Sequence, residues 1–250
     1  MNIVVCVKRV PDTETKIKIG GEGTKIDPAG VEFIISPFDE FAVEEAIRVK
    51  ERLGKGEVTI LSLGPADAQT IMRKAYAMGA DKGVHLNDPT ECQDTLAEAQ
   101  ALAAALKEMS FDILLFGKQA VDYDNGAVGV QVAKLLNLPV VTRIIKLDVA
   151  DGKAIVERES DMGKEIVEVK LPAAFTAEKG LNEPRYPKLM DIMKAKKKPL
   201  EERPAQLGAP KLSIVKMDYP SARPPGKIVG EGEEAVPALV NLLKNEAKAL

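Results

Sequence analysis

Strand and helix patterns alternate along the first 140 residues, and this alternation restricts the possible fold more than any other feature of the chain. Short runs rich in apolar and β-branched residues predict strands at 3–7, 58–63, 83–86, 113–116 and 140–142. Several of these runs are apolar throughout, which is typical of a parallel sheet covered on both faces. The sequence therefore predicts an α/β fold built on a Rossmann-like, doubly wound parallel sheet with right-handed crossovers.

Four helices are predicted between these strands. The first has the clearest start, because Ser36 can cap it, Pro37 suits its first turn and Asp39 completes a capping-box pattern. The four helices are expected at about 37–53, 66–78, 95–108 and 126–136.

After residue 140 the regular alternation of strand and helix patterns ends. Asp151–Gly152 is a good turn dipeptide and predicts a β-hairpin, and the run at 164–177 adds further strand. A proline-rich stretch then extends to residue 230, and we expect it to wrap around a partner because it cannot easily form its own core. A final amphipathic helix is predicted at about 231–249.

The composition excludes several classes of protein. The net charge of −3 argues against a general nucleic-acid-binding protein, and no apolar run approaches the ~18 residues of a membrane-spanning helix. The N-terminal residues lack the basic start and long apolar core of a signal peptide. The two cysteines, Cys6 and Cys92, indicate a reducing compartment. We therefore expect a bacterial-type cytoplasmic location, although a processed chain of the mitochondrial matrix would look similar.

The residue types give no convincing acid–base, nucleophilic or metal site. His85 is the only histidine in the sequence, and we interpret it as structural because it lies at the end of a predicted strand. The sequence contains no Gly-x-Ser-x-Gly elbow and no Cys/His cluster with metal-ligand spacing. Any catalysis is therefore expected to depend on a bound cofactor.

The segment 111–131 is the strongest candidate for a ligand site. An apolar strand runs into a polar, glycine-punctuated loop that feeds a helix, and a helix N-terminus of this kind favours phosphate. Gly117, Gly126 and Gly129 allow a close approach of the backbone. The pattern matches neither Gly-x-Gly-x-x-Gly nor the P-loop signature, so the nucleotide-loop interpretation competes with an ordinary strand-to-helix connection.

The same loop carries two carboxylates, Asp122 and Asp124, which do not suit a phosphate group. We expect them to face a ribose, the loop itself or a partner. The loop after Val7 and the turn at 63–65 follow other predicted strands. Because ligands of open α/β sheets bind at the carboxyl ends of the strands, these segments are expected to share the site.

Several segments together resemble one protein family. The segment GKQAVDYDNGAVGVQVAKLLNLP, at 117–139, resembles the nucleotide loop of the electron transfer flavoprotein β subunit. The segment at 156–199, which ends LNEPRYPKLMDIMKAKKKP, resembles that family's signature region and the loop after it. SPFDEFAVEEAIRVKE and AYAMGAD are also similar. The resemblance runs from residue 1 to about 199, with departures at Met162 and at Ala174–Phe175.

The resemblance implies a fold similar to the adenine nucleotide α-hydrolase type and a place in a heterodimer. In the common members of the family, the β subunit binds AMP structurally, and the α subunit holds the redox-active FAD in a mobile domain. The heterodimer accepts electrons from dehydrogenases such as acyl-CoA dehydrogenases and passes them to a quinone oxidoreductase. The resemblance therefore implies an electron-carrier subunit rather than a self-contained enzyme.

Residue roles follow from the resemblance by position. The implied AMP contacts are Cys6, Ser36, Asp39, Leu63, Gln119, Ala120, Val121, Asp122, Asn125, Gly126, Ala127, Val128, Gly129 and Val130. We expect the backbone N–H groups of 126–129 to hold the phosphate, and Ser36 stands where the family often has Asn. Phe38 matches a residue that approaches the partner's flavin ring; the alternative is a hydrophobic staple for the helix that follows.

The loop after the signature region implies a docking site. Leu189 matches the leucine that enters an apolar pocket on dehydrogenase partners, and the alternative is a helix-packing residue. The lysines expected to steer acidic partner surfaces, or else to form a solvated helix end, are Lys194, Lys196, Lys197 and Lys198. We therefore assign 1–185 to a nucleotide-binding α/β domain and 186–250 to a recognition loop and C-terminal extension that packs on the partner subunit.

Two other functions stay open on the sequence. In a bifurcating relative, the β subunit holds a second FAD that NADH reduces, and the complex is then an oxidoreductase in its own right. A stand-alone nucleotide-binding protein of the stress type is the third possibility. The proline-rich tail and the match to the recognition loop argue against it.

Overall fold

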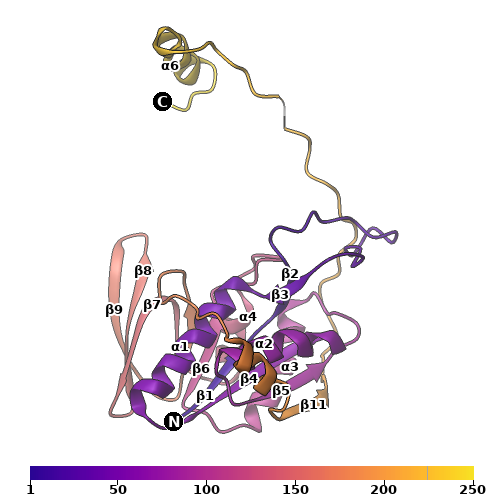
Figure 1. Ribbon diagram of the computed structural model, residues 1–250, viewed down its shortest axis with the longest axis vertical. Helices are drawn as coiled ribbons and strands as arrows, with labels where there is room; N and C mark the ends of the chain where they lie inside the picture. Colours follow the sequence, from indigo (N-terminus) through magenta and orange to yellow (C-terminus); the bar gives the residue numbers. More distant parts are fainter. Residues whose placement is uncertain (224) are drawn as a thin grey trace. The chain divides into compact units, whose positions relative to one another are not determined.

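A computed structural model describes residues 1–223 and 225–250. These residues divide into two compact units, Met1–Lys216 and Met217–Leu250, and each is described by itself (Figure 1). Within the described residues, no helix is long and apolar enough to cross a membrane. The predicted domain boundary at residue 185 stays a prediction.

The first unit is built on a nine-stranded, mostly parallel sheet. Its strands lie in the order β11 (Leu200–Pro204), β5 (Lys82–Asn87), β4 (Glu57–Gly64), β1 (Asn2–Cys6), β6 (Ile113–Gly117), β10 (Ala173–Ala177), β7 (Val140–Ala150), β8 (Lys153–Ser160) and β9 (Gly163–Lys170). Neighbours from β11 to β7 run parallel, and β7, β8 and β9 pair antiparallel at one edge. The predicted Rossmann-like, doubly wound sheet is confirmed.

Helices cover both faces of this sheet, because successive side chains of each strand point to opposite sides. The helices of the first unit are α1 (Pro37–Leu53), α2 (Gln69–Met78) with the 3₁₀ turn η1 (Ala66–Ala68) before it, α3 (Thr95–Lys107), α4 (Val128–Leu135) and α5 (Leu189–Ala195). Ile3 and Val5 of β1 face a core shared with α1 and α2, whereas Val4 and Cys6 face a core shared with α3 and α4. A separate two-stranded sheet joins β2 (Arg9–Pro11) to β3 (Phe33–Ile35).

Two helices have boundaries that differ from the predicted ones. α4 begins at Val128 rather than at Gly126, because Gly126 has a φ of +60°, which is outside the helical region. In the second unit, α6 covers Val236–Asn245, after a 3₁₀ turn η2 at Glu233–Ala235, and is shorter than the predicted 231–249. Gly232 before this turn has a φ of +69°, so helical structure cannot begin before residue 233.

The second half of the chain adds strands that local patterns describe only in part. The predicted hairpin joins β7 to β8 through Asp151–Gly152. The apolar run at 164–177 forms two separate strands, because β9 pairs with β8 while β10 inserts between β6 and β7. The charged strand β11 was not predicted. It lies at the edge of the sheet, where charged residues and a proline are tolerated.

The predicted capping box at the start of α1 is wrong. Ser36 occupies the N-cap position, but its side chain makes no capping hydrogen bond to the described residues. The carboxylate of Asp39 instead accepts the backbone N–H of Lys8 at 2.7 Å and that of Gly117 at 2.9 Å. Lys8 follows β1 and Gly117 ends β6, so Asp39 fixes the first turn of α1 to two neighbouring strand ends.

The glycine at the end of β6 is required by this close approach. A Cβ atom at Gly117 would lie 2.7 Å from the carbonyl carbon of Phe38 and 2.8 Å from the backbone nitrogen of Asp39. It would also collide with the Oδ1 atom of Asp39. The contact between α1 and β6 therefore depends on the absence of a side chain at this position.

Replacing Asp39 with alanine would leave the N–H groups of Lys8 and Gly117 without this acceptor. We expect the free energy of unfolding to fall by about 2–4 kcal/mol, because each unsatisfied buried donor costs about 1–3 kcal/mol. Urea denaturation would measure the loss. The control is Glu40→Ala in the same turn, which removes an ion pair with Lys74 at 3.3 Å. Equal losses in the two variants would contradict the anchoring role of Asp39.

Candidate functional site

The predicted nucleotide loop lines a cleft at the carboxyl edge of the sheet. The cleft contains about 720 Å³ of empty space, part of which is open to solvent. Its lining residues are Cys6, Val7, Lys8, Asp39, Leu63, Thr95, Glu98, Leu102, Phe116, Gly117, Lys118, Gln119, Ala120, Asp122, Tyr123, Asn125, Gly126, Ala127, Val128 and Gly129. They come from the ends of β1, β4 and β6, from α1 and α3, and from the loop that leads into α4.

The topology of the sheet explains why the cleft lies there. The chain leaves β1 toward β4 and β5 on one side and then returns to β6 on the other side of β1. The strand order therefore reverses between β1 and β6. In open α/β sheets, ligands bind outside the carboxyl ends of the strands at such a switch point.

The loop between β6 and α4 is held by its own hydrogen bonds. The Nε2 atom of Gln119 donates to Oδ1 of Asp124 at 2.5 Å, and the N–H of Asp124 donates to the carbonyl of Ala120 at 3.0 Å. Asp124 therefore faces the loop itself, which is one of the three roles considered for it. The bonds fix the loop immediately before α4 begins.

The start of α4 has the properties of an anion site. The first N–H groups of a helix have no acceptor within the helix, and they carry the positive end of its dipole. The N-cap residue is Ala127, which has no polar side chain to satisfy these donors. Within Val128–Leu135, the first turn contains no acidic residue. Because α4 begins at Val128, the first N–H groups of the helix belong to Val128 and Gly129, while Gly126 and Ala127 precede it.

A different part of the cleft is anionic. The Nζ atom of Lys8 lies 2.8 Å from Oδ2 of Asp122 and 3.7 Å from Oε1 of Glu98. The same ammonium lies 5.3 Å from the centre of the Tyr123 ring. Burial raises the pKa of Glu98, and the two carboxylates raise the pKa of Lys8 despite its burial. One lysine thus faces two acidic groups, so this part of the cleft disfavours a phosphate.

Burial also changes the titration of two groups at the floor of the cleft. Burial raises the pKa of Asp39 to about 7, although the N–H donors of Lys8 and Gly117 act in the opposite direction. Burial raises the pKa of the Cys6 thiol well above its ordinary value, and Asp39 adds to this effect. Cys6 is therefore a protonated, small side chain at the floor of the site rather than a reactive thiolate.

The cleft brings together most of the residues that the family resemblance implies. The expected residues that line it are Cys6, Asp39, Leu63, Gln119, Ala120, Asp122, Asn125, Gly126, Ala127, Val128 and Gly129. Ser36, Phe38, Val121 and Val130 are not among the lining residues. Ser36 is buried beneath the loop, where its hydroxyl lies 3.5 Å from the carbonyl of Gln119. Phe38 lies under the Lys118 ammonium, which is 4.7 Å from the centre of its ring.

Sequence reasoning missed the contribution of α3, which supplies Thr95, Glu98 and Leu102 to the lining. Within the segment 111–131 it did not single out Phe116, Lys118 and Tyr123, whereas Gly117 and the loop after Val7, which contains Lys8, were expected at the site. The helical spacing of Thr95, Glu98 and Leu102 places them on one face of α3, and this spacing is visible in the sequence. Which side of the sheet that face meets is decided only by the topology.

The surroundings of the single histidine support a structural role. His85 is fully buried in β5, and its Nε2 atom lies 3.0 Å from the carbonyl oxygen of Gly64. Its Nδ1 atom lies 3.4 Å from the side-chain amide of Gln69. Across residues 1–223 and 225–250, no group of three His, Cys, Asp or Glu side chains is arranged to hold a metal ion.

A second candidate site surrounds α5. Leu189, Met190 and Met193 have exposed fractions of 75%, 68% and 64%. Apolar side chains that are exposed together in this way mark interaction surfaces. Lys194, Lys196 and Lys197 are also exposed, and they follow these apolar residues directly in the chain.

Lys198 differs from the other three lysines. Its Nζ atom donates to the carbonyls of Tyr76 at 3.1 Å and Ala80 at 2.5 Å, at the C-terminal end of α2. Burial lowers the pKa of Lys198. The ammonium is therefore engaged in holding α2 and the segment after α5 together.

Comparisons with known proteins identify the family of the chain. A family model described as the electron transfer flavoprotein domain matches residues 24–207. Electron transfer flavoprotein subunit beta of Bacillus subtilis is 41% identical over 260 residues, with 100% of both chains covered. The human protein of the same name is 40% identical over 246 residues, with 96% of both chains covered. The protein of this name from Dictyostelium discoideum is 40% identical over 243 residues, covering 96% of this chain and 97% of the relative.

The matched residues include the cleft loop, the α5 segment and nearly the whole sheet. The similarity to the relatives extends over nearly the full length of both chains, so it is not limited to a shared nucleotide-binding core. The chain therefore belongs to the electron transfer flavoprotein β-subunit family.

Proposed function

We propose that this chain binds AMP as a structural ligand in the cleft between β1 and β6. The observation that carries the proposal is the meeting of the α4 N-terminus with the carboxyl ends of these two strands. The N–H groups at the start of α4 would hold the phosphate, and the apolar walls formed by Leu63 and Leu102 would enclose the nucleoside. AMP in this role would add further contacts to a loop that its own hydrogen bonds already hold, and it would perform no chemistry.

The charges of the cleft favour one phosphate group over the pyrophosphate of FAD. The two lysines that line it are already paired, Lys8 with Asp122 and Lys118 with Glu178 at 3.0 Å. A helix N-terminus carries a charge of roughly +0.5, which suits one phosphate. A second phosphate would need a further cation, and the paired lysines do not supply it. The bifurcating alternative, with a second FAD, is therefore less favoured.

The complex that we propose contains an electron transfer flavoprotein α subunit as the partner. The α subunit would hold the redox-active FAD, and the complex would shuttle electrons from acyl-CoA or similar dehydrogenases to a quinone oxidoreductase. This chain would contribute AMP binding and dehydrogenase docking, so it is an electron-carrier subunit. A bacterial-type cytoplasm stays the predicted compartment.

The docking surface that we propose is α5, with Leu189 as its central apolar anchor. Met190 and Met193 would widen the apolar contact, and Lys194, Lys196 and Lys197 would attract an acidic partner surface. Charges of this kind mainly increase the rate of association, whereas a buried apolar anchor determines how long the complex lasts.

The bound nucleotides test the first part of the proposal. The chain is co-expressed with an electron transfer flavoprotein α subunit, the purified complex is denatured, and the released nucleotides are quantified by chromatography. We expect one FAD and one AMP per heterodimer. Two FAD and no AMP would contradict AMP binding and support the bifurcating alternative.

Replacing Gly129 with leucine tests the position of the phosphate. Gly129 packs against Phe116, and an added Cβ would lie 3.0 Å from the Cγ atom of that ring. We expect the start of α4 to shift and most of the AMP to be lost from the purified complex, while circular dichroism shows a folded protein. The control is Gly21→Leu, where a Cβ meets no atom within 4 Å. Full retention of AMP by a folded Gly129→Leu variant would place the phosphate elsewhere.

Replacing Leu189 with alanine tests the docking anchor. We expect kcat/KM for reduction of the complex by an acyl-CoA dehydrogenase to fall about tenfold or more, since a hot-spot side chain contributes about 2 kcal/mol or more. AMP and FAD content should not change. The matched control is Met162→Ala at the exposed β8–β9 turn, which should leave the kinetics unaltered. Unchanged kinetics for Leu189→Ala would exclude it as the anchor.

A further inference from the structure

The docking helix α5 packs against α2 through its C-terminal end, but it is short and most of its apolar side chains are exposed. It contains seven residues, and isolated helices of this length are not stable in water. Within α5, the buried residue is Ala195, at the C-terminal end. The conformation of α5 therefore depends also on how the segments on either side of it are held.

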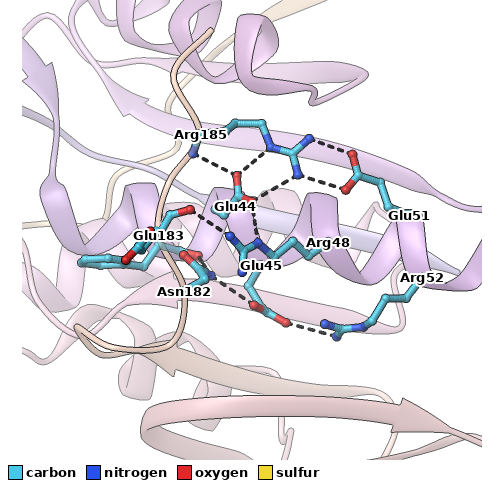
Figure 2. Close-up of polar contacts among 9 residues, drawn as sticks. Glu44, Glu45, Arg48, Glu51, Arg52, Asn182, Glu183 and Arg185 are labelled. Atoms are coloured by element: carbon cyan, nitrogen blue, oxygen red, sulfur yellow. Dashed lines mark hydrogen bonds and ion pairs between the residues drawn. The ribbon is translucent and has the colours of Figure 1, made fainter.

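The segment before α5 is held by a network of charged groups on α1 (Figure 2). The guanidinium of Arg185 contacts Glu44 through Nε at 2.8 Å and Glu51 through Nη1 at 2.7 Å. Its Nη2 atom contacts the same two carboxylates, at 3.1 Å and 3.0 Å. The Glu44 side chain is only 2% exposed, and the hydrogen bonds from Arg185 lower the pKa of Glu51. A planar guanidinium between two carboxylates fixes orientation as well as distance.

Further contacts tie the same segment to α1. Arg48 pairs with Glu44 at 2.6 Å and donates to the carbonyl of Glu183 at 3.0 Å. Asn182 donates to Oε2 of Glu45 at 3.1 Å, as Figure 2 also shows. The chain just before the docking helix is therefore held at consecutive points along α1.

The segment after α5 is held by α2. The Nη1 atom of Arg73 donates to the carbonyls of Ala195 at 2.9 Å and Lys198 at 2.6 Å. The hydroxyl of Tyr76 donates to the carbonyl of Pro199 at 2.9 Å. Both ends of α5 are thus fixed by polar contacts, while its apolar side chains remain exposed.

We propose that Arg185, held between Glu44 and Glu51, is a positioning residue that fixes α5 in its docking conformation before a dehydrogenase binds. This inference rests on the proposed docking role of α5. A segment that is already ordered loses less conformational freedom on binding, so the same contacts give a higher affinity. Arg185 acts through Leu189, which it positions and which would enter the pocket of the partner.

Two substitutions at Arg185 test the proposal in the full complex with the α subunit. In Arg185→Ala, Glu44 keeps its ion pair with Arg48, so no buried charge is left alone and the protein should fold. We expect hydrogen exchange at the α5 amides to become about tenfold faster. The KM for the complex as electron acceptor from an acyl-CoA dehydrogenase should rise about tenfold, and kcat at saturation should stay unchanged.

In Arg185→Lys, exchange at α5 and KM should both lie between the values for the wild type and for Arg185→Ala, because an ammonium cannot bridge two carboxylates in one plane. The control is Lys82→Ala, which removes an exposed ion pair of 2.6 Å with Glu57 between β5 and β4. It should change neither exchange at α5 nor KM. AMP and FAD content should be the same in all of these variants.

The readouts separate this inference from the proposed function. If Arg185→Ala changes neither exchange nor KM, or speeds exchange without raising KM, the positioning role of Arg185 is overturned. If the wild-type complex accepts no electrons, or Leu189→Ala has no effect, the docking function itself fails. Faster exchange together with a higher KM and an unchanged kcat supports the proposal.

Discussion

The buried carboxylate of Asp39 is the contact on which the arrangement of the cleft depends. It accepts the backbone N–H groups of Lys8 and Gly117, which lie at the ends of two neighbouring parallel strands. A parallel sheet leaves such donors without partners where the strands end, and one carboxylate with two oxygens satisfies both. The first turn of α1, the floor of the cleft and the start of the loop after β6 are fixed by these two hydrogen bonds.

The same helix connects the two candidate sites. The first turn of α1 carries Asp39 at the cleft, and its later turns carry Glu44 and Glu51, which hold Arg185 before α5. α1 packs on the sheet through a continuous apolar face. Nucleotide binding and partner docking would therefore share one structural support, although they use different side chains.

The two sites differ in how they use charge. In the cleft, Lys8 and Lys118 are paired with carboxylates of the same chain, so binding of a phosphate would rely on backbone N–H groups. Around α5, Lys194, Lys196 and Lys197 are exposed and lie beside exposed apolar side chains. Paired charges in a cleft fix its shape, whereas exposed charges around an apolar surface attract a partner from a distance.

Much of the fold could be predicted from the sequence because its signals are local. Apolar runs and helical stripes indicated the strands β1, β4, β5 and β6 and the helices between them. The glycine-rich loop before α4 was also visible, because glycine and the strand-to-helix transition are local features. The charged edge strand β11 and the insertion of β10 beside β6 were not predicted, since pairing between distant segments has no local pattern.

By itself, the sequence determined the α/β class, the order of the main elements, the family and the two segments that carry the candidate sites. Only the tertiary structure decided that Asp39 anchors two strand ends rather than capping its own helix, because its partners lie 31 and 78 residues away. The structure likewise decided that Lys8 and Glu98 enter the cleft and that Arg185 pairs with α1. Burial and charge pairing depend on which distant residues the fold brings within a few ångströms, and periodicity along the chain does not contain that information.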